Sequence, residues 1–308
     1  MEYIGYKLVF STAVHFGEGN LEDSGNKLYA DTIFSALCHE AVSLGCIDKL
    51  ISCVQNSNVK LSDAFPFIDD TYYVPKPMVS LDSDKSADDK KKTKKLEYIS
   101  GDLIYEYLNG SMDIVAESEK LAKLGISDIR TQASINANED TRPYSVGTYT
   151  FSENAGLYLI IGYNDEEGLH LIRDLLISLS FTGIGGKRSS GLGKFELHNV
   201  TLPDCLIKRI SDAEYSNRVM SLSIGMCEDE ELEDICRNAR YLLSKRSGFI
   251  SSSTYANKLV KKQDSYLFRS GSIFSKPFTG IIRDVSIKGT HPVYCYANPI
   301  FMEVSDNE

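Results

Sequence analysis

The sequence lacks long hydrophobic runs, paired cysteines and an excess of basic residues. No stretch reaches the ~18 to 20 consecutive apolar residues that a membrane-spanning helix requires. The N-terminal residues MEYIGYKLVF also lack the basic and then apolar blocks of a signal peptide. The 7 cysteines are widely spaced without a CxxC pair, which is typical of free thiols in a reducing compartment. We therefore expect a cytoplasmic protein without a membrane partner.

Metal and nucleotide motifs are missing as well. No two histidines stand at i, i+4 and no cysteines have the spacing of a zinc site, so we expect no metal. The GK dipeptides at 186–187 and 193–194 are followed by Arg and Phe, not by the Ser or Thr of a Walker A loop. The order around them is helix to strand, which is the reverse of a dinucleotide-binding turn. We expect no cofactor.

Charge is unevenly distributed along the chain. The net charge of -10, from 33 basic and 43 acidic residues, excludes a protein coated in basic surface for bulk DNA or membrane binding. Residues 240–288 nevertheless hold ten basic residues against two acidic ones, while the segment 228–234 (EDEELED) has six acids in seven positions. The acidic segment is typical of the first turn of a helix. Such segregation predicts one local polyanion-binding surface.

Hydrophobic spacing predicts the elements of the first 200 residues. A strand over 2–11 alternates with its apolar face on even positions, and a helix follows from Asp31 to Gly45. Extended segments come next, among them 71–79, whose prolines favour an edge strand or an extended crossing segment. A buried strand over 156–163, a helix beginning near Asp165 and a strand over 193–202 complete the series. This is the order of a ferredoxin-like, or RRM-like, sheet.

Two insertions interrupt that order. Residues 82–97 are rich in lysine and acid with almost no apolar side chains, which predicts a mobile segment. Residues 129–151 contain two extended arms joined by the turn formers NANED, which predicts a projecting hairpin.

The remainder of the chain predicts a second domain. A strand over 218–226 is followed by apolar residues at helical spacing from Leu232 to Leu243, and then by strands separated by glycines. We therefore expect an α+β protein of two ferredoxin-like domains, residues 1–203 and 204–308, of which the second is degenerate.

The segment FTGIGGKRSSGLGKFEL is the most specific feature. Its glycines allow backbone N–H groups to approach phosphate oxygens, while basic and hydroxyl side chains add donors. We expect this loop to cradle a nucleic-acid backbone. A plain glycine-rich turn on the surface is the alternative.

Several segments together resemble one family. GIGGKRSSGLGKFE resembles the glycine-rich loop of the RAMP superfamily of CRISPR-associated proteins. HFGEG, YADTIFSAL, KRSGFI and RSGSIF add similarity to the family that forms subunit four of the type III-A CRISPR (Csm) effector complex. The resemblance implies two ferredoxin-like domains and no enzyme activity. It also implies that the chain holds the repeat-derived 5′ tag of the guide RNA and contacts the large polymerase subunit and the first backbone subunit.

The motifs supply the candidate RNA-binding residues. They are His15 and Gly17 of HFGEG; Gly185, Gly186, Lys187, Arg188, Ser189, Ser190, Gly191 and Lys194 of the glycine loop; Arg130 and Arg142 of the hairpin; Arg246 of KRSGFI; and Gly271 and Ser272 of RSGSIF. In RAMP backbone subunits a comparable hairpin wedges between guide and target. A surface hairpin for subunit contact remains the alternative.

Other readings stay open for individual residues. His15 could serve as acid or base in a metal-independent repeat-RNA endoribonuclease, as in RNA-cutting RAMP relatives. Asp31 could be a slicing carboxylate, although its position before an apolar run favours a helix cap. Lys258, Lys261 and Lys262 could contact RNA or form a solvated strand face. A generic RRM-like binder is disfavoured because the aromatic RNP pattern is not evident.

Overall fold

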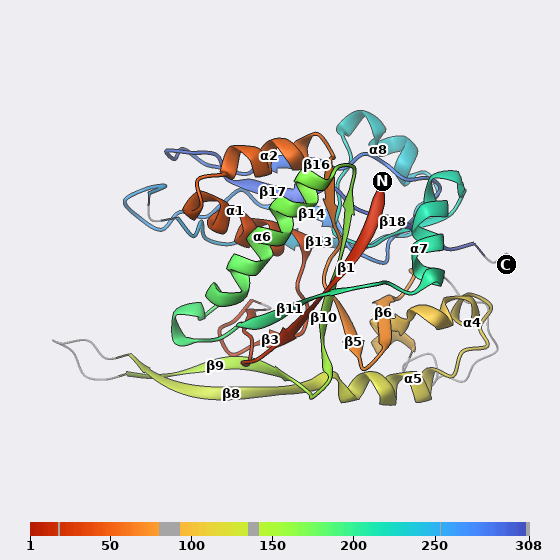
Figure 1. The fold of residues 1–308 in the computed structure, drawn as a ribbon, viewed down its shortest axis with the longest axis horizontal. Coiled ribbons are helices and arrows are strands. Elements are labelled where there is room, and N and C mark those ends of the chain that lie inside the picture. The colour runs from red at the N-terminus through yellow and green to blue at the C-terminus, as the bar shows by residue number, and fades with distance from the viewer. Residues whose placement is uncertain (18, 80–92, 135–141, 253, 306–308) are drawn as a thin grey trace.

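The computed structural model describes residues 1–17, 19–79, 93–134, 142–252 and 254–305 (Figure 1). The helices are α1 (Ala30–Ser43), α2 (Ile47–Gln55), α4 (Ile104–Leu108), α5 (Ile114–Leu121), α6 (Glu166–Thr182), α7 (Asp204–Ser211) and α8 (Asp229–Cys236). Short 3-10 helices are η1 (Gly101–Leu103), η2 (Ala122–Leu124), η3 (Arg188–Ser190) and η4 (Asp212–Tyr215).

The strands form one large sheet, one three-stranded sheet and several pairs. They are β1 (Glu2–Phe10), β2 (Phe16–Gly17), β3 (Ser24–Gly25), β4 (Val59–Leu61), β5 (Phe65–Ile68), β6 (Thr71–Pro75), β7 (Tyr98–Ser100), β8 (Gly125–Ser134), β9 (Arg142–Phe151), β10 (Ala155–Tyr163), β11 (Phe195–Val200), β12 (Val219–Ser221), β13 (Leu243–Arg246), β14 (Ser265–Phe268), β15 (Ile273–Phe274), β16 (Ile281–Asp284), β17 (Tyr294–Ala297) and β18 (Phe301–Glu303).

The large sheet runs β11-β1-β10-β5-β6-β7, with β4 beside β10, and its pairs are antiparallel. The strands expected over 2–11, 156–163 and 193–202 are confirmed as β1, β10 and β11, and the two helices as α1 and α6. Helix α6 begins where predicted, because the Asp165 carboxylate accepts a hydrogen bond from the Gly168 amide at 2.7 Å. Gly45 follows α1 with φ +69°, a conformation that favours glycine at a helix end.

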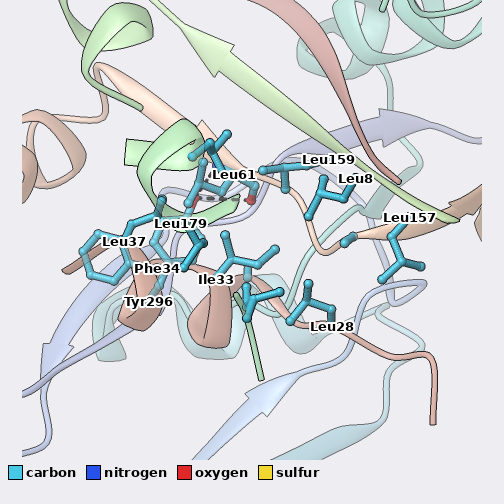
Figure 2. Close-up of a cluster of buried hydrophobic side chains, with 14 of the residues drawn as sticks. Leu8, Leu28, Ile33, Phe34, Leu37, Leu61, Leu157, Leu159, Leu179 and Tyr296 are labelled. Atoms are coloured by element: carbon cyan, nitrogen blue, oxygen red, sulfur yellow. Dashed lines mark hydrogen bonds between the residues drawn. The ribbon is translucent and has the colours of Figure 1, made fainter. Parts of the chain in front are cut away.

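Both faces of the sheet are buried. Along β10, Leu157, Leu159 and Ile161 enter one hydrophobic core, and the alternating Tyr158 and Ile160 enter a second core on the opposite face. The first core also contains apolar residues of α1, α2 and α6, as Figure 2 shows for part of it. The expected apolar face of β1 on even positions is confirmed, because Tyr6 and Leu8 are buried, and the odd-numbered Tyr3 and Val9 are partly buried against the second core.

The C-terminal part of the chain shares these cores. Tyr296 of β17 packs against Phe34 of α1 with ring centroids 5.5 Å apart, and its hydroxyl accepts a hydrogen bond from the Leu61 amide at 2.7 Å (Figure 2). On the other face, Met220 and Met302 of the β15-β12-β18 sheet join the second core. The segments that follow residue 203 are therefore packed directly onto the large sheet.

Two expectations about local structure were wrong. The helix expected as far as Leu243 ends at Cys236, because the Arg240 amide donates to the Ile273 carbonyl in an extended bridge and Leu243 begins β13. Strand β6 is not an edge strand, since it pairs with β5 through Tyr72 and with β7 through Tyr73. Proline is tolerated there because Pro75 is the last residue of the strand.

The expected insertions have different outcomes. Most of the segment 82–97, residues 82–92, lies outside the described residues. At its end Leu96 is buried, and the Glu97 carboxylate pairs with the Lys27 ammonium at 2.7 Å, so this end is not mobile as expected.

The hairpin is confirmed and is longer than expected. Strands β8 and β9 pair along their whole length, from Gly125 with Phe151 to Ser134 with Arg142. Figure 1 shows the hairpin extending away from the body of the protein. The NANED tip, residues 136–140, lies outside the described residues. Among the helices that the structure describes, none is long and apolar enough to cross a membrane.

Candidate nucleic-acid interface

A cleft of about 800 Å³ lies between the first helix, the glycine loop and strand β13. Its walls come from four segments: residues 15–17 with Gly19, residues 27–39, residues 184–188, and residues 243–251. Three of the motifs that resemble the RAMP family in sequence (HFGEG, YADTIFSAL, KRSGFI) therefore meet the glycine loop at one place. Lys262 and Arg269 add two cations from the C-terminal part of the chain.

The cleft is strongly basic. Its lining includes Lys27, Arg188, Lys245, Arg246, Lys262 and Arg269, and Asp31 is the acid among the described lining residues. Three of the cations have carboxylate partners: Lys27 with Glu97, Lys245 with Asp264, and Arg246 with Asp31. Within the described part of the chain, Arg188, Lys262 and Arg269 form no ion pair, so their charge faces the cleft uncompensated. Such a cleft suits a polyanion.

The glycine loop is held open by unusual backbone conformations. Gly183, Gly185, Gly191 and Gly193 have φ values of +82°, +95°, +84° and +79°, and Lys187 lies at +58°. A Cβ on Gly193 would lie 2.0 Å from the Ile184 carbonyl oxygen, so this position requires glycine for close approach as well as for φ.

The loop is tied to the segment that follows β1. The Gly186 amide donates to the His15 carbonyl and the Gly193 amide to the Ala13 carbonyl, each at 2.9 Å. Within the described residues, the amides of Gly185, Lys187, Arg188 and Ser189 make no hydrogen bond. These donors are available to phosphate oxygens.

His15 lies under this loop. Its Nδ1 is 2.7 Å from the Gly147 carbonyl oxygen of β9, and the side chain is 8% exposed where it borders the cleft. His39, from α1, borders the same cleft. Burial, together with the nearby Arg188 guanidinium, lowers the pKa of His39, so this imidazole is neutral at pH 7.

Asp31 does not cap helix α1, which was the favoured expectation. Helix α1 begins at Ala30, and the amide of Ala30 donates instead to the buried Asp63 carboxylate at 2.8 Å. Asp31 lies in the first turn, and its carboxylate accepts two hydrogen bonds from Arg246 at 2.8 Å. Arg246 also lies over the Tyr29 ring, 4.6 Å from its centroid. Burial of Arg246 is outweighed by Asp31, which raises the pKa of the guanidinium.

The hairpin contacts the glycine loop through Tyr144, which lies toward the outer end of β9. The Lys187 ammonium donates to the Tyr144 hydroxyl at 3.3 Å and lies 4.6 Å from the centre of the Tyr144 ring. Arg130 and Arg142 are exposed on the two arms of the hairpin and do not line the cleft. The hairpin is thus adjacent to the cleft, and its two arginines lie along a separate projecting surface.

The predicted residues fall into four groups, one of which is the hairpin pair Arg130 and Arg142 described above. Cleft-lining residues are His15, Gly17, Gly185, Gly186, Arg188 and Arg246. Residues of the loop that extend beyond the cleft are Lys187, Ser189, Ser190, Gly191 and Lys194. The structure does not bring Gly271 and Ser272 to the cleft: Ser272 is fully buried, and its hydroxyl donates to the Arg269 carbonyl at 2.6 Å.

Sequence reasoning missed several lining residues. Lys27, Tyr29 and His39 stand near or within YADTIFSAL, and Arg269 is the first residue of RSGSIF. The motif positions were visible, but which side chains turn toward the cleft depends on the fold. Among the described residues, no group of three or more His, Cys, Asp or Glu could hold a metal ion.

Known proteins are similar in sequence to this chain over nearly its whole length. The family model of the CRISPR Csm4 C-terminal domain matches residues 214–304. The CRISPR system Cms protein Csm4 of Mycobacterium tuberculosis (strain ATCC 25618 / H37Rv) is 38% identical over 294 residues, which is 95% of each chain. The protein of the same name from Streptococcus thermophilus is 36% identical over 314 residues and 99% of each chain.

Solved structures share the fold. A chain of the Csm3-Csm4 subcomplex in the type III-A CRISPR-Cas interference complex aligns with a TM-score of 0.65 and 18% identity over 98% of this chain and 99% of that one. A chain of the Csm1-Csm4 cassette in complex with cA4 aligns with a TM-score of 0.60 and 17% identity over 99% of both chains. Like those chains, this protein combines helices with antiparallel sheets.

Proposed function

Because the chain belongs to the Csm4 family of type III-A CRISPR systems, we propose that it is a non-catalytic RNA-binding subunit that holds the 5′ repeat-derived tag of the guide RNA. The observation that carries this proposal is the basic cleft in which three family motifs meet the glycine loop. Phosphate oxygens would contact the free loop amides and the unpaired cations Arg188, Lys262 and Arg269. Base pairing with the target remains the task of the guide itself.

The proposed site residues have different roles. Arg188 and the loop amides would hold phosphates, whereas Lys187 would keep the hairpin against the loop through Tyr144. Arg130 and Arg142 would contact RNA that leaves the cleft along the hairpin. Arg246 would act indirectly, because its donors are directed at Asp31 and Thr32.

We also propose that residues 1–203 form a ferredoxin-like unit. Its elements occur in the order β1, α1, β5, β10, α6 and β11, and the corresponding strands lie in the order β11-β1-β10-β5. This arrangement supports the βαββαβ pattern with antiparallel strands. The domain boundary near residue 203 remains a prediction.

We propose that the subunit links the large polymerase subunit, Csm1, to the backbone subunit Csm3. Solved relatives of the same fold were determined as Csm1-Csm4 and Csm3-Csm4 assemblies. Exposed apolar side chains at Leu242, Leu243 and Tyr266, on and beside the β13–β14 pair, offer surface suited to a protein partner.

The absence of catalysis is part of the proposal. Asp31 resembles a slicing carboxylate by position, but its side chain is 3% exposed and neutralised by Arg246. The alternative, a metal-independent repeat-RNA endoribonuclease, is kept because the His15 ring borders the cleft beside the glycine loop. Repeat RNA incubated with the purified chain without metal tests it: scission that the His15→Ala substitution removes would favour the enzyme.

Sequencing the RNA that copurifies with the native complex tests the main proposal. The expected result is a population of RNAs with a common repeat-derived 5′ end. Crosslinking should place that end on residues 184–188 or 243–251. RNA with random 5′ ends, or a complex without RNA, would overturn the assignment.

A further inference from the structure

The hydrogen bond of His15 determines which ring nitrogen carries the proton. Its Nδ1 lies 2.7 Å from the Gly147 carbonyl oxygen, and a carbonyl oxygen can only accept. In the neutral imidazole Nδ1 is therefore the donor, and Nε2 carries the lone pair. Within the described residues Nε2 has no hydrogen-bond partner.

Two glycines keep Nε2 accessible. A Cβ on Gly17 would lie 3.3 Å from His15 Nε2, and a Cβ on Gly186 would lie 2.5 Å from His15 Cδ2 and 3.5 Å from Nε2. Both glycines line the cleft with His15. Side chains at either position would cover the nitrogen, so the glycines leave an opening through which a ligand can reach it.

A hydrogen-bond acceptor at this position cannot form a hydrogen bond with a phosphate oxygen. Phosphate oxygens only accept hydrogen bonds, and the surrounding lysines, arginines and loop amides supply the donors that they need. A neutral Nε2 needs a donor from the ligand instead. Nε2 adjoins Gly186 of the loop that would hold the backbone, and the donor nearest a ribonucleotide phosphate is the 2′-hydroxyl of the sugar.

We propose that His15 is a specificity residue that accepts a hydrogen bond from a ribose 2′-hydroxyl and so makes the cleft select RNA over DNA. The proposal rests on the proposed RNA-binding function. The same contact would precede attack by the 2′-hydroxyl in the alternative enzyme, and the scission assay above separates these two roles.

The test compares three oligonucleotides of one mixed sequence: RNA, DNA and fully 2′-fluoro RNA. The 2′-fluoro strand keeps the RNA sugar pucker and the bases, but it has no 2′ donor. Binding of the full-length chain is measured by fluorescence anisotropy. The key variant is His15→Asn, because the Asn amide nitrogen can replace Nδ1 in the bond to Gly147 while the Nε2 acceptor is lost. His198→Asn, at an exposed position of β11, is the matched control.

The wild-type protein and the control should bind RNA about 3- to 10-fold more tightly than 2′-fluoro RNA, as expected for one neutral hydrogen bond. His15→Asn should abolish that difference by weakening RNA binding alone. Equal binding of RNA and 2′-fluoro RNA by the wild type would overturn the inference but leave RNA binding intact, and would point to a donor on a base. A ratio that His15→Asn preserves would also overturn it, and would mean that another residue contacts the 2′-hydroxyl. Failure to bind any of the three strands would contradict the proposed function itself.

Discussion

Arg246 and Asp31 lie 215 residues apart in the sequence and form an ion pair with two hydrogen bonds of 2.8 Å. The pair joins β13 to the first turn of α1, and both residues line the basic cleft. It therefore sets the distance between the two parts of the chain that would enclose a bound strand.

Replacing Arg246 by Ala should destabilise the fold by about 3 to 5 kcal/mol, because the Asp31 carboxylate would remain buried without a cationic partner. Urea unfolding measures the change. Replacing both residues by apolar ones, Asp31→Leu with Arg246→Met, should cost clearly less than Arg246→Ala alone. A double variant that is no more stable than the single one would show that the pair is not the main contribution of Arg246.

The sequence predicted the elements that follow from local periodicity and missed what depends on distant contacts. Strand β10 and helix α6 could be predicted because their apolar spacing and the Asp165 cap are local signals. The role of Asp31 could not be predicted, since the residue that caps α1 is Asp63 and the partner of Asp31 comes from β13. A local sequence pattern does not indicate contacts with residues that are distant in the sequence.

In the candidate site, too, some features could be predicted from the sequence and others depend on the fold. The glycine loop was identified from composition alone, and its positive φ values confirm that the glycines are needed. Ser272 was chosen from a motif match and is fully buried, whereas Arg269 of the same motif lines the cleft. A motif marks the segment, but burial decides which of its residues can meet a ligand.

Two glycines of the loop should respond differently to alanine. Gly191→Ala should cost about 1 kcal/mol, since only its φ of +84° is unfavourable and the space around it is open. Gly193→Ala should cost considerably more and weaken RNA binding, because its Cβ would collide with the Ile184 carbonyl. Urea unfolding and anisotropy measured on both variants check this, and equal effects would contradict the geometry.

Asp63 should make the stability of the protein depend on pH. Burial raises the pKa of its carboxyl to about 6, although the amides of Ala30 and Ile224 oppose the shift. Above an unfolded value near 3.8 the unfolded chain releases this proton first, so stability falls as pH rises from about 4 to 6. The shift corresponds to at most roughly 3 kcal/mol.

Asp63→Asn should remove this dependence while its amide oxygen keeps both hydrogen bonds. The free energy of unfolding of the wild type relative to Asp63→Asn should therefore decline between pH 4 and 6. Urea titrations at several pH values measure it, and a constant difference would show that Asp63 is ionised throughout that range.

The salt dependence of RNA binding should identify the cations that contact phosphate. Each phosphate contact releases counterions, and removing one lowers the slope of log K against log salt by roughly 1. Lys187→Ala with Arg188→Ala should therefore reduce the slope by about 1 to 2 and weaken binding at low salt. Because Lys187 already contacts Tyr144, we expect Arg188 to account for the larger part of this reduction in slope.

The matched control is Lys123→Ala with Lys208→Ala, which removes the same charge from exposed positions that do not line the cleft. It should leave the slope nearly unchanged. Equal slopes for the two double variants would mean that total charge, and not the glycine loop, attracts the RNA.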